Sequence, residues 1–420
     1  MCMKYMIVAG EASGDLHGSR LIAGLRKADP DAGVRFIGGD NMAAAAGREP
    51  EIDYSELNVM GFSEVLRALP RILRILRRAR RILEEYRPDA LVLVDFPGFN
   101  LKLARIAHRM GIPVHYFISP KIWAWKEWRI KKIRRYVDAM YAILPFEEKY
   151  YGLKHNYRVE YVGNPTVLEI DEAMKKLPAL QHFCERQGID DSRPIIALLP
   201  GSRRGEIRNN LRIMIEAAHR FPECQYIVAA APSIPERFYR QCAQDPGLKL
   251  VFGATLTLLK YARAALVTSG TATLETALMA TPQVVCYRAN GSKLSYKIME
   301  KLLKVKYVSL PNLIADAPVV PELLVHNCTV KNVASALAPL VQASPGRDRQ
   351  LAGYKTIRRI LGTKVATDNA GRLIYKSLLE KKERDEKEER DEERKEEREV
   401  ERKGDGAVDK ESAAINKENR

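Results

Sequence analysis

The sequence has few cysteines, and it lacks the cysteine spacing of disulfide-linked or metal-bound proteins. Its 420 residues include six cysteines, and no two of them are spaced as C-x-x-C. We therefore expect reduced thiols, without a zinc cage or a disulfide framework. No stretch approaches the ~18 uninterrupted apolar residues of a membrane-spanning helix, and residues 1–10 lead into charged residues without a leader-peptide cleavage site. These absences predict a cytoplasmic protein.

What the chain has in excess is positive charge. The formal net charge is +16, but residues 380–420 carry 13 Lys/Arg against 17 Asp/Glu, which leaves a net +20 on residues 1–379. A body this basic is expected to bind nucleic acid, an anionic membrane or phosphorylated small molecules, and charge alone does not choose among them.

Short apolar runs alternate with helical patterns through most of the chain. This alternation is typical of parallel βα units, and it restarts after Gly163–Pro165. We therefore predict the α/β fold class, with two Rossmann-like domains, residues 1–165 and 166–345, facing across a cleft. The carboxyl ends of the strands should bind ligands there. The predicted strands are Tyr5–Ala9, Val34–Ile37, Ala90–Val94, Val114–Ile118, Ala139–Leu144, Val159–Val162, Ile195–Leu199, Tyr226–Ala230, Leu248–Val251, Ala265–Val267 and Gln283–Tyr287.

The last part of the chain has a different composition. From Lys331 the pattern is helical, and after about Leu379 the residues are almost all Glu, Lys, Arg and Asp. Glu-to-Lys/Arg pairs four residues apart can hold a solvated helix without a core. We expect residues 346–379 to be helices that pack back on the body. Residues 380–420 should be a charged helical or disordered tail, disordered from Gly404.

Two strand-to-helix turns in the second domain have the composition of anion sites. Backbone N–H groups at a helix N-terminus bind phosphate, and hydroxyl and guanidinium groups add donors. The first turn lacks the spacing of a P-loop, so an NTPase is not expected. The alternative is a plain strand-to-helix turn with exposed arginines for the first, and a capping box around Thr271 and Glu275 for the second. Two such turns in one sheet favour a nucleotide-diphosphate site, with Glu275 on a ribose; its residues are Gly201, Ser202, Arg203, Ser269, Gly270, Thr271, Ala272 and Glu275.

The turn after the first strand is acidic. It carries Glu11, Ser13 and Asp15, and it lacks the G-x-G-x-x-G pattern. Two carboxylates would repel a pyrophosphate, so a dinucleotide is not expected, and these residues should instead face hydroxyl groups of an acceptor or a sugar. The alternative for Asp15 is a helix cap.

Asp95 directly follows the apolar strand Leu91–Val94. A carboxylate at the end of a central strand points into the cleft, and an apolar surround raises its pKa toward that of a general base. The alternative is a structural Asp that caps a helix from Asn100.

The segment from Pro70 to Tyr86 is strongly amphipathic, with apolar residues on one half and arginines on the other. Such a helix can lie in a membrane interface, and a surface helix packed on the sheet is the alternative. All three tryptophans lie between Trp123 and Trp128 among basic residues, without a nucleic-acid recognition pattern, so nucleic acid is not expected. The predicted membrane contacts are Met60, Phe62, Leu69, Ile72, Leu73, Leu76, Arg74, Arg78, Trp123 and Trp125.

Six strings, in order along residues 1–375, resemble those of the lipid-A-disaccharide synthase family. The resemblance implies an inverting GT-B glycosyltransferase without a cofactor that moves 2,3-diacylglucosamine from UDP onto 2,3-diacylglucosamine 1-phosphate. The first domain would lie on the acceptor side and the second on the UDP-sugar side. The strings are Val8–Asp15, Val59–Phe62, Ile118–Trp125, Leu199–Arg203, Ser269–Glu275 and Tyr307–Asn312.

The resemblance also assigns residues. The family's essential aspartate falls on Asp95, its functional arginine on Arg203 and its asparagine on Asn312, whereas Gly98 stands where a second acid is often found. The only D-x-D pair, Asp29–Asp31, precedes the second strand, at the end of the sheet away from the cleft, which favours catalysis without a metal.

Alternative functions, the oligomeric state and the location of the protein stay open at this point. A UDP-N-acetylglucosamine 2-epimerase shares the expected architecture, and a non-enzymatic lipid- or RNA-binding module is a third possibility. C-terminal helices exchanged between chains would give a homodimer. The resemblance and the basic, apolar segments together imply peripheral association with the inner face of the inner membrane of a Gram-negative bacterium.

Overall fold

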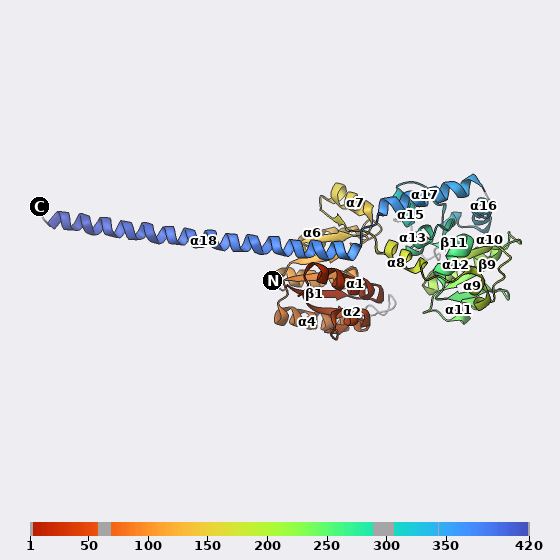
Figure 1. Cartoon of the computed structure of the whole chain (residues 1–420), viewed down its shortest axis with the longest axis horizontal. Coiled ribbons are helices and arrows are strands. Elements are labelled where there is room, and N and C mark those ends of the chain that lie inside the picture. Colours follow the sequence, from red (N-terminus) through yellow and green to blue (C-terminus); the bar gives the residue numbers. More distant parts are fainter. Residues whose placement is uncertain (1–2, 58–68, 289–305, 343, 419–420) are drawn as a thin grey trace.

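The computed structural model describes residues 3–57, 69–288, 306–342 and 344–418. These residues form two α/β lobes, each built on a parallel sheet, and one long helix that runs back over the first lobe and extends beyond it (Figure 1). The two Rossmann-like domains predicted from the alternation of strands and helices are therefore present.

The N lobe contains a seven-stranded parallel sheet in the order β3-β2-β1-β4-β5-β6-β7. Its strands are β1 Lys4–Ala9, β2 Gly33–Gly38, β3 Ile52–Asp53, β4 Ala90–Val94, β5 Val114–Phe117, β6 Ala139–Ala142 and β7 Glu160–Tyr161. Its helices are α1 Ala12–Ala28, α2 Asp40–Ala46, α4 Leu69–Tyr86, α5 Pro97–Arg109, α6 Ile130–Tyr136 and α7 Pro145–His155, with 3-10 turns at Tyr54–Leu57 and Glu127–Arg129. The sequence pattern predicted every one of these strands except β3, which has two residues.

The C lobe contains a six-stranded parallel sheet in the order β10-β9-β8-β11-β12-β13. Its strands are β8 Ile195–Leu199, β9 Gln225–Ala230, β10 Leu250–Phe252, β11 Ala262–Thr268, β12 Gln283–Tyr287 and β13 Glu322–Leu324. The helices around it are α8 Pro165–Met174, α9 Leu180–Gln187, α10 Arg204–Ala218, α11 Glu236–Ala243, α12 Thr255–Tyr261, α13 Thr271–Leu278, α15 Leu310–Ala315, α16 Val330–Val341 and α17 Pro345–Leu361, with a 3-10 turn at Val325–Asn327. Strand β13 was not predicted.

Helix α18, Ala366–Glu418, returns from the C lobe to the N lobe. It packs on α1 so closely that a Cβ on Gly371 would lie 2.6 Å from the backbone of Gly24. Beyond Leu379 it extends away from the body as one continuous helix (Figure 1). The helix includes the segment from Gly404, for which disorder was expected and which contains no proline.

Helix α4 packs on the sheet of the N lobe. Four residues of its apolar half, Ile75, Leu76, Ala79 and Leu83, are 0–7% exposed and share a core with residues of β1 and β4. For this half of the helix, packing on the sheet is the observed alternative. The predicted contact of Leu76 with acyl chains is wrong, because its side chain is inside the core.

The outer side of α4 carries the other predicted membrane contacts of this helix. Leu73 is 42% exposed, Ile72 is partly buried against the core, and Arg74 is exposed. The Arg78 guanidinium forms an ion pair with Glu56 at 2.8 Å. No helix within the described ranges is both long enough and apolar enough to cross a membrane.

Candidate active site

Asp95 lies in a strained turn between β4 and α5. The φ angles of Asp95 and Phe96 are 43° and 45°, in the left-handed region that costs a non-glycine residue about 1–3 kcal/mol. Two buried side chains hold the turn, because the Asn100 amide donates to the Asp95 carbonyl at 2.7 Å and the Tyr116 hydroxyl donates to the same oxygen. Helix α5 begins at Pro97 with Phe96 as its N-cap, so Asp95 is not the helix cap that the alternative proposed. Strain enforced in this way points to a functional position.

The turns after β1 and β4 meet where the strand order of the sheet reverses. These strands are paired, with Ala9 opposite Val94, and ligands of open α/β sheets bind at such a reversal. A Cβ on Gly10 would overlap the Phe96 ring. Glycine is therefore required for the turns to approach each other.

Glu11 and Ser13 lie on the Asp95 side of α1. The Glu11 carboxylate accepts a hydrogen bond from the Ser13 hydroxyl at 2.7 Å. Burial raises the pKa of Asp95 above its usual value, the cations of Lys121 and Arg129 oppose the rise, and the charge of Glu11 adds to it. The structure thus brings these predicted residues together around one partly desolvated carboxylate, which suits a general base.

Asp15 has a different role from its neighbours in the same turn. It is 1% exposed and accepts hydrogen bonds from the backbone N–H groups of Gly39 at 2.6 Å, Asn41 at 3.1 Å and Met42 at 3.2 Å. Its carboxylate therefore caps α2, a helix distant in sequence. The prediction that Asp15 binds the acceptor is not supported, because both its oxygens are already used inside the fold.

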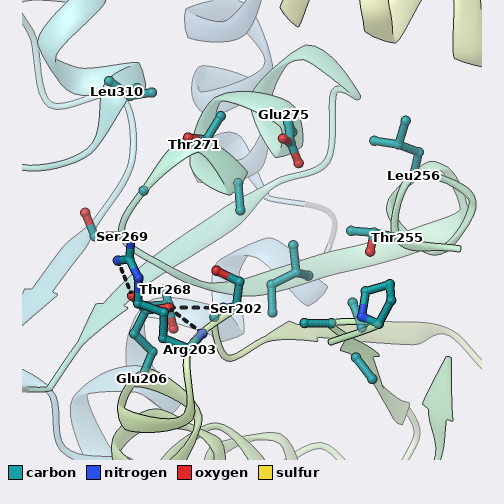
Figure 2. A pocket seen from close by; sticks show the side chains of 18 of the residues that line it. Ser202, Arg203, Glu206, Thr255, Leu256, Thr268, Ser269, Thr271, Glu275 and Leu310 are labelled. Carbon is teal, nitrogen blue, oxygen red and sulfur yellow. Dashed lines mark hydrogen bonds and ion pairs between the residues drawn. The ribbon is translucent and has the colours of Figure 1, made fainter. Parts of the chain in front are cut away.

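The C lobe presents a cavity of about 800 Å³ at the carboxyl ends of its strands. It is centred on the reversal of strand order between β8 and β11. Every nucleotide-site residue predicted in the two turns lines it, namely Gly201, Ser202, Arg203, Ser269, Gly270, Thr271, Ala272 and Glu275. Figure 2 shows the labelled members of both turns around the same hollow.

The Glu206 carboxylate is hydrogen-bonded to the backbone N–H groups of the first turn, residues 201–203. Its carboxylate accepts hydrogen bonds from the backbone of Ser202 at 3.0 Å and Arg203 at 3.3 Å, and the Arg203 guanidinium donates to it at 3.1 Å (Figure 2). A capping interaction is therefore observed at this turn, where the sequence did not predict one. An anion binding at this turn must replace Glu206 on these donors.

The second turn begins α13. Gly270 has a φ of 152°, and the Ser269 hydroxyl donates to the Val308 carbonyl at 3.2 Å. The Thr268 hydroxyl is buried and has no hydrogen-bond partner among the described residues, although Thr268 lines the cavity. Burial raises the pKa of Glu275, and the charge of Glu169 adds to the rise. The unpaired Thr268 hydroxyl indicates a place for a polar ligand atom.

Asn312 lies behind the cavity and does not line it. It is 1% exposed, and its amide donates to the Val320 carbonyl and to Glu322, both at 2.9 Å. Its carbonyl accepts from the Val320 N–H at 2.8 Å. The predicted contact of Asn312 with a phosphate or sugar is not supported, because this amide joins α15 to the strand β13.

Two residues of the N lobe reach the cavity, Lys121 and Trp123. Lys121 also lies close enough to Asp95 to oppose the rise in its pKa. Sequence reasoning placed Lys121 only among general basic residues, although it stands inside the string Ile118–Trp125. Lys121 thus lies between the cavity of the C lobe and the Asp95 carboxylate of the N lobe.

The predicted membrane contacts outside α4 and at its first residue have three different outcomes. Trp125 and the neighbouring Trp128 are 49% and 57% exposed, and the Lys126 ammonium lies 3.8 Å above the Trp125 ring. Trp123 points inward and lines the cavity. Met60, Phe62 and the side chain of Leu69 lie outside the described residues.

Two Rossmann-like lobes, with a carboxylate at the strand reversal of one and a cavity with two helix N-termini at that of the other, have the GT-B architecture. Residues 5–373 match the family model described as lipid-A-disaccharide synthetase. The lipid-A-disaccharide synthase of Myxococcus xanthus is 40% identical over 89% of this chain and 97% of the relative, and that of Geobacter metallireducens is 35% identical over 90% and 98%. The chain belongs to the lipid-A-disaccharide synthase family and is a glycosyltransferase.

Solved structures confirm the predicted GT-B fold. The UDP-GlcNAc 2-epimerase of Neisseria meningitidis bound to UDP-GlcNAc is similar with a TM-score of 0.62 at 16% identity, covering 90% of this chain and all of that one. A glycosyltransferase from Rickettsia africae is similar with a TM-score of 0.54 at 12% identity, covering 90% and 99%. Identities this low show the fold alone. The epimerase alternative is therefore no better supported than the family assignment.

Proposed function

We propose that the enzyme transfers 2,3-diacylglucosamine from UDP-2,3-diacylglucosamine to 2,3-diacylglucosamine 1-phosphate, giving the β-1,6-linked lipid A disaccharide 1-phosphate and UDP. The observation that carries the proposal is the relation of Asp95 to the cavity. Asp95 stands in a strained turn of one lobe, and Lys121 lies near it while lining the cavity of the other. A donor in the cavity would thus lie opposite a base from the acceptor lobe.

On the acceptor side, Asp95 takes the proton of the 6-hydroxyl as that oxygen attacks the anomeric carbon of the donor. The bond from the anomeric carbon to the acceptor oxygen forms while the bond to the UDP oxygen breaks, and UDP leaves with the bonding electrons. Burial supports this role, since it raises the pKa of Asp95 and strengthens it as a base. Glu11 and Ser13, joined by their hydrogen bond, orient a sugar hydroxyl beside it.

On the donor side, the N-termini of α10 and α13 hold the diphosphate of the departing UDP. The N–H groups at these helix starts, once the diphosphate displaces Glu206 from Ser202 and Arg203, and the positive ends of the helix dipoles favour the charge that develops there. Arg203 is 83% exposed and so can turn from Glu206 to the phosphates. The Thr268 hydroxyl adds a donor, and Glu275 accepts from the ribose hydroxyls.

The acylated substrates require access to a lipid surface. We place the docking face at the exposed Trp125, Trp128 and Leu73 and the arginines of α4, which suits the interface of an anionic membrane. The enzyme would then work peripherally at the cytoplasmic side of the inner membrane of a Gram-negative bacterium. Exchange of α18 between two chains would preserve its packing on α1 in a homodimer, and the mass of the protein in solution tests this.

The test is mass spectrometry of the products formed by purified protein from UDP-2,3-diacylglucosamine and the monosaccharide 1-phosphate. The expected products are the disaccharide 1-phosphate and an equal amount of UDP. Absence of the disaccharide contradicts the proposal. Turnover of UDP-N-acetylglucosamine without a lipid acceptor would instead favour the epimerase.

A further inference from the structure

A buried carboxyl group lies beneath the N-lobe segment 119–123, which reaches the cavity of the C lobe. Glu147, on α7, is 1% exposed. It accepts hydrogen bonds from the Ser119 hydroxyl at 2.7 Å and from the Trp123 indole N–H at 2.9 Å. Each carboxyl oxygen therefore holds one donor of the segment 119–123.

Two further contacts from α7 hold the same segment. The Tyr151 hydroxyl donates to the Pro120 carbonyl at 2.6 Å. The Trp123 ring packs edge-to-face on Phe146, with ring centroids 5.1 Å apart. One helix thus fixes the segment at several successive points, and Glu147 accepts two of the three hydrogen bonds.

This segment carries what the N lobe contributes to the donor cavity. Lys121 and Trp123 are the described N-lobe residues, before α8, that line it. Lys121 lies between the two anchored residues, Ser119 and Trp123, so the position of its ammonium group depends on both anchors.

We infer that Glu147 is a positioning residue, which fixes Lys121 and Trp123 against the donor cavity through the hydrogen bonds from Ser119 and Trp123. The inference rests on the proposed function, because it takes the cavity as the site of the UDP-sugar. A carboxylate is required because it accepts on both oxygens, whereas an amide accepts on one and presents a donor on the other. Glu147 itself does not line the cavity, and it acts through its two partners.

The protonation of Glu147 falls in an accessible range. Burial raises its pKa to about 7, while the donors Ser119 and Trp123, the Lys121 ammonium and the backbone of Leu144 oppose the rise. The Tyr151 hydroxyl also faces it. Above this pH both oxygens accept, and below it one carries a proton that competes with a donor. The segment should therefore loosen as the pH falls.

The test compares Glu147→Gln with Glu148→Gln. Glu148 is the next residue of α7, is exposed, and accepts from the Tyr161 N–H, which a glutamine can also do. We expect Glu147→Gln to raise the KM for the UDP-sugar and the Kd for UDP about tenfold, with little change in kcat. The ratio of the Kd of the variant for UDP to that of the wild type should approach one as the pH falls from 8 to 6, because a protonated Glu147 resembles a glutamine. Glu148→Gln should match the wild type throughout.

A second pair of variants keeps the inference testable if Glu147→Gln does not fold. Trp123→Phe keeps an aromatic ring, although a smaller one, and removes the indole N–H, and Ser119→Ala removes the hydroxyl. Each variant should raise the Kd for UDP, as Glu147→Gln does. In the double variant with Glu147→Gln, Trp123→Phe should raise the Kd by a smaller factor than it does alone. An unchanged Kd in the single variants, or a loss confined to kcat, overturns the inference. Because UDP binding needs no turnover, wild type that binds UDP but forms no disaccharide overturns the proposed function alone.

Discussion

Glu206 accepts a hydrogen bond from the backbone N–H of Ser202 at 3.0 Å, at the point where the diphosphate of the donor is proposed to bind. A bound diphosphate and this carboxylate would compete for the same donors. We expect Glu206→Ala to bind UDP several-fold more tightly, since it removes a like charge. It should also lose about 0.5–2 kcal/mol of stability with the cap of α10. Calorimetry with UDP and thermal unfolding measure the two effects. Weaker UDP binding would show that Glu206 contacts the ligand.

Replacement of the proposed base should separate chemistry from binding. Asp95→Asn keeps the size of the side chain but cannot take the proton, so kcat should fall about 10²–10⁴-fold while the UDP Kd stays unchanged. In the wild type, burial raises the pKa of Asp95, so a larger fraction is protonated at low pH and kcat/KM should fall on acidification. The variant should lack this limb of the pH profile. A kcat within threefold of the wild type would rule out Asp95 as the base.

The close approach of the two turns can be tested with a pair of glycines. A Cβ on Gly10 would overlap the Phe96 ring, whereas a Cβ on Gly98 meets nothing within 4 Å. Gly10→Ala should therefore cost about 1–3 kcal/mol by overpacking. Gly98→Ala lies in α5 and should leave stability unchanged or raise it by up to about 1 kcal/mol. Chemical denaturation measures both. Equal stabilities of the two variants would contradict the packing described here.

The proposed docking face predicts a loss of lipid binding without a loss of fold. Trp125 and Trp128 are 49% and 57% exposed, so W125A/W128A should leave thermal unfolding unchanged. Its partitioning to vesicles of phosphatidylglycerol and phosphatidylcholine should fall on the order of tenfold, and added salt should weaken the binding of both proteins. Leu153→Ala is the matched control, because Leu153 is 79% exposed on α7. Equal effects of the two changes would remove the tryptophans from the docking face.

Two truncations separate the parts of α18. A chain that ends at Leu379 loses, among the described contacts, the ion pairs Lys382–Asp89 at 3.5 Å and Lys376–Glu380 at 3.6 Å, each of which as a surface pair is worth about 0–1 kcal/mol. Its midpoint of thermal unfolding should match the full chain. A chain that ends at Leu361 also loses Ile374 and Leu378, which are 0% and 3% exposed and are each worth about 1.5–3 kcal/mol. We expect this chain to lose a cooperative transition of the N lobe in calorimetry. Retention of that transition would show that α18 is dispensable.

The sequence predicts the sheets well because their central strands are apolar runs between polar turns. It misses β3 and β13, which have two and three residues and lack a visible period. It extends the strand at Val114 to Ile118, whose φ of 67° takes it out of the sheet. The amphipathic pattern of α4 could not distinguish a sheet surface from a membrane, because both bury the same stripe.

For the site, the sequence places residue types at strand ends but does not show whether their polar atoms are already paired. The Asp15 carboxylate accepts hydrogen bonds from Gly39 and Asn41, more than twenty positions away. The Asn312 amide is paired with Val320 and Glu322, eight and ten positions further along the chain. The role of Lys121 was missed for a related reason, since Asp95 lies on a different strand. Such pairings depend on the tertiary fold.

The packing of α18 on α1 has a consequence for the order in which the protein forms. Ala370, Ile374 and Leu378 belong to the same core as β1, although more than 360 residues separate them from it in the chain. A domain normally folds as a unit once it has left the ribosome. Here the first lobe to be synthesised leaves the apolar residues of α1 that pack on α18 uncovered until that helix has emerged. The N lobe therefore begins folding first and is completed last.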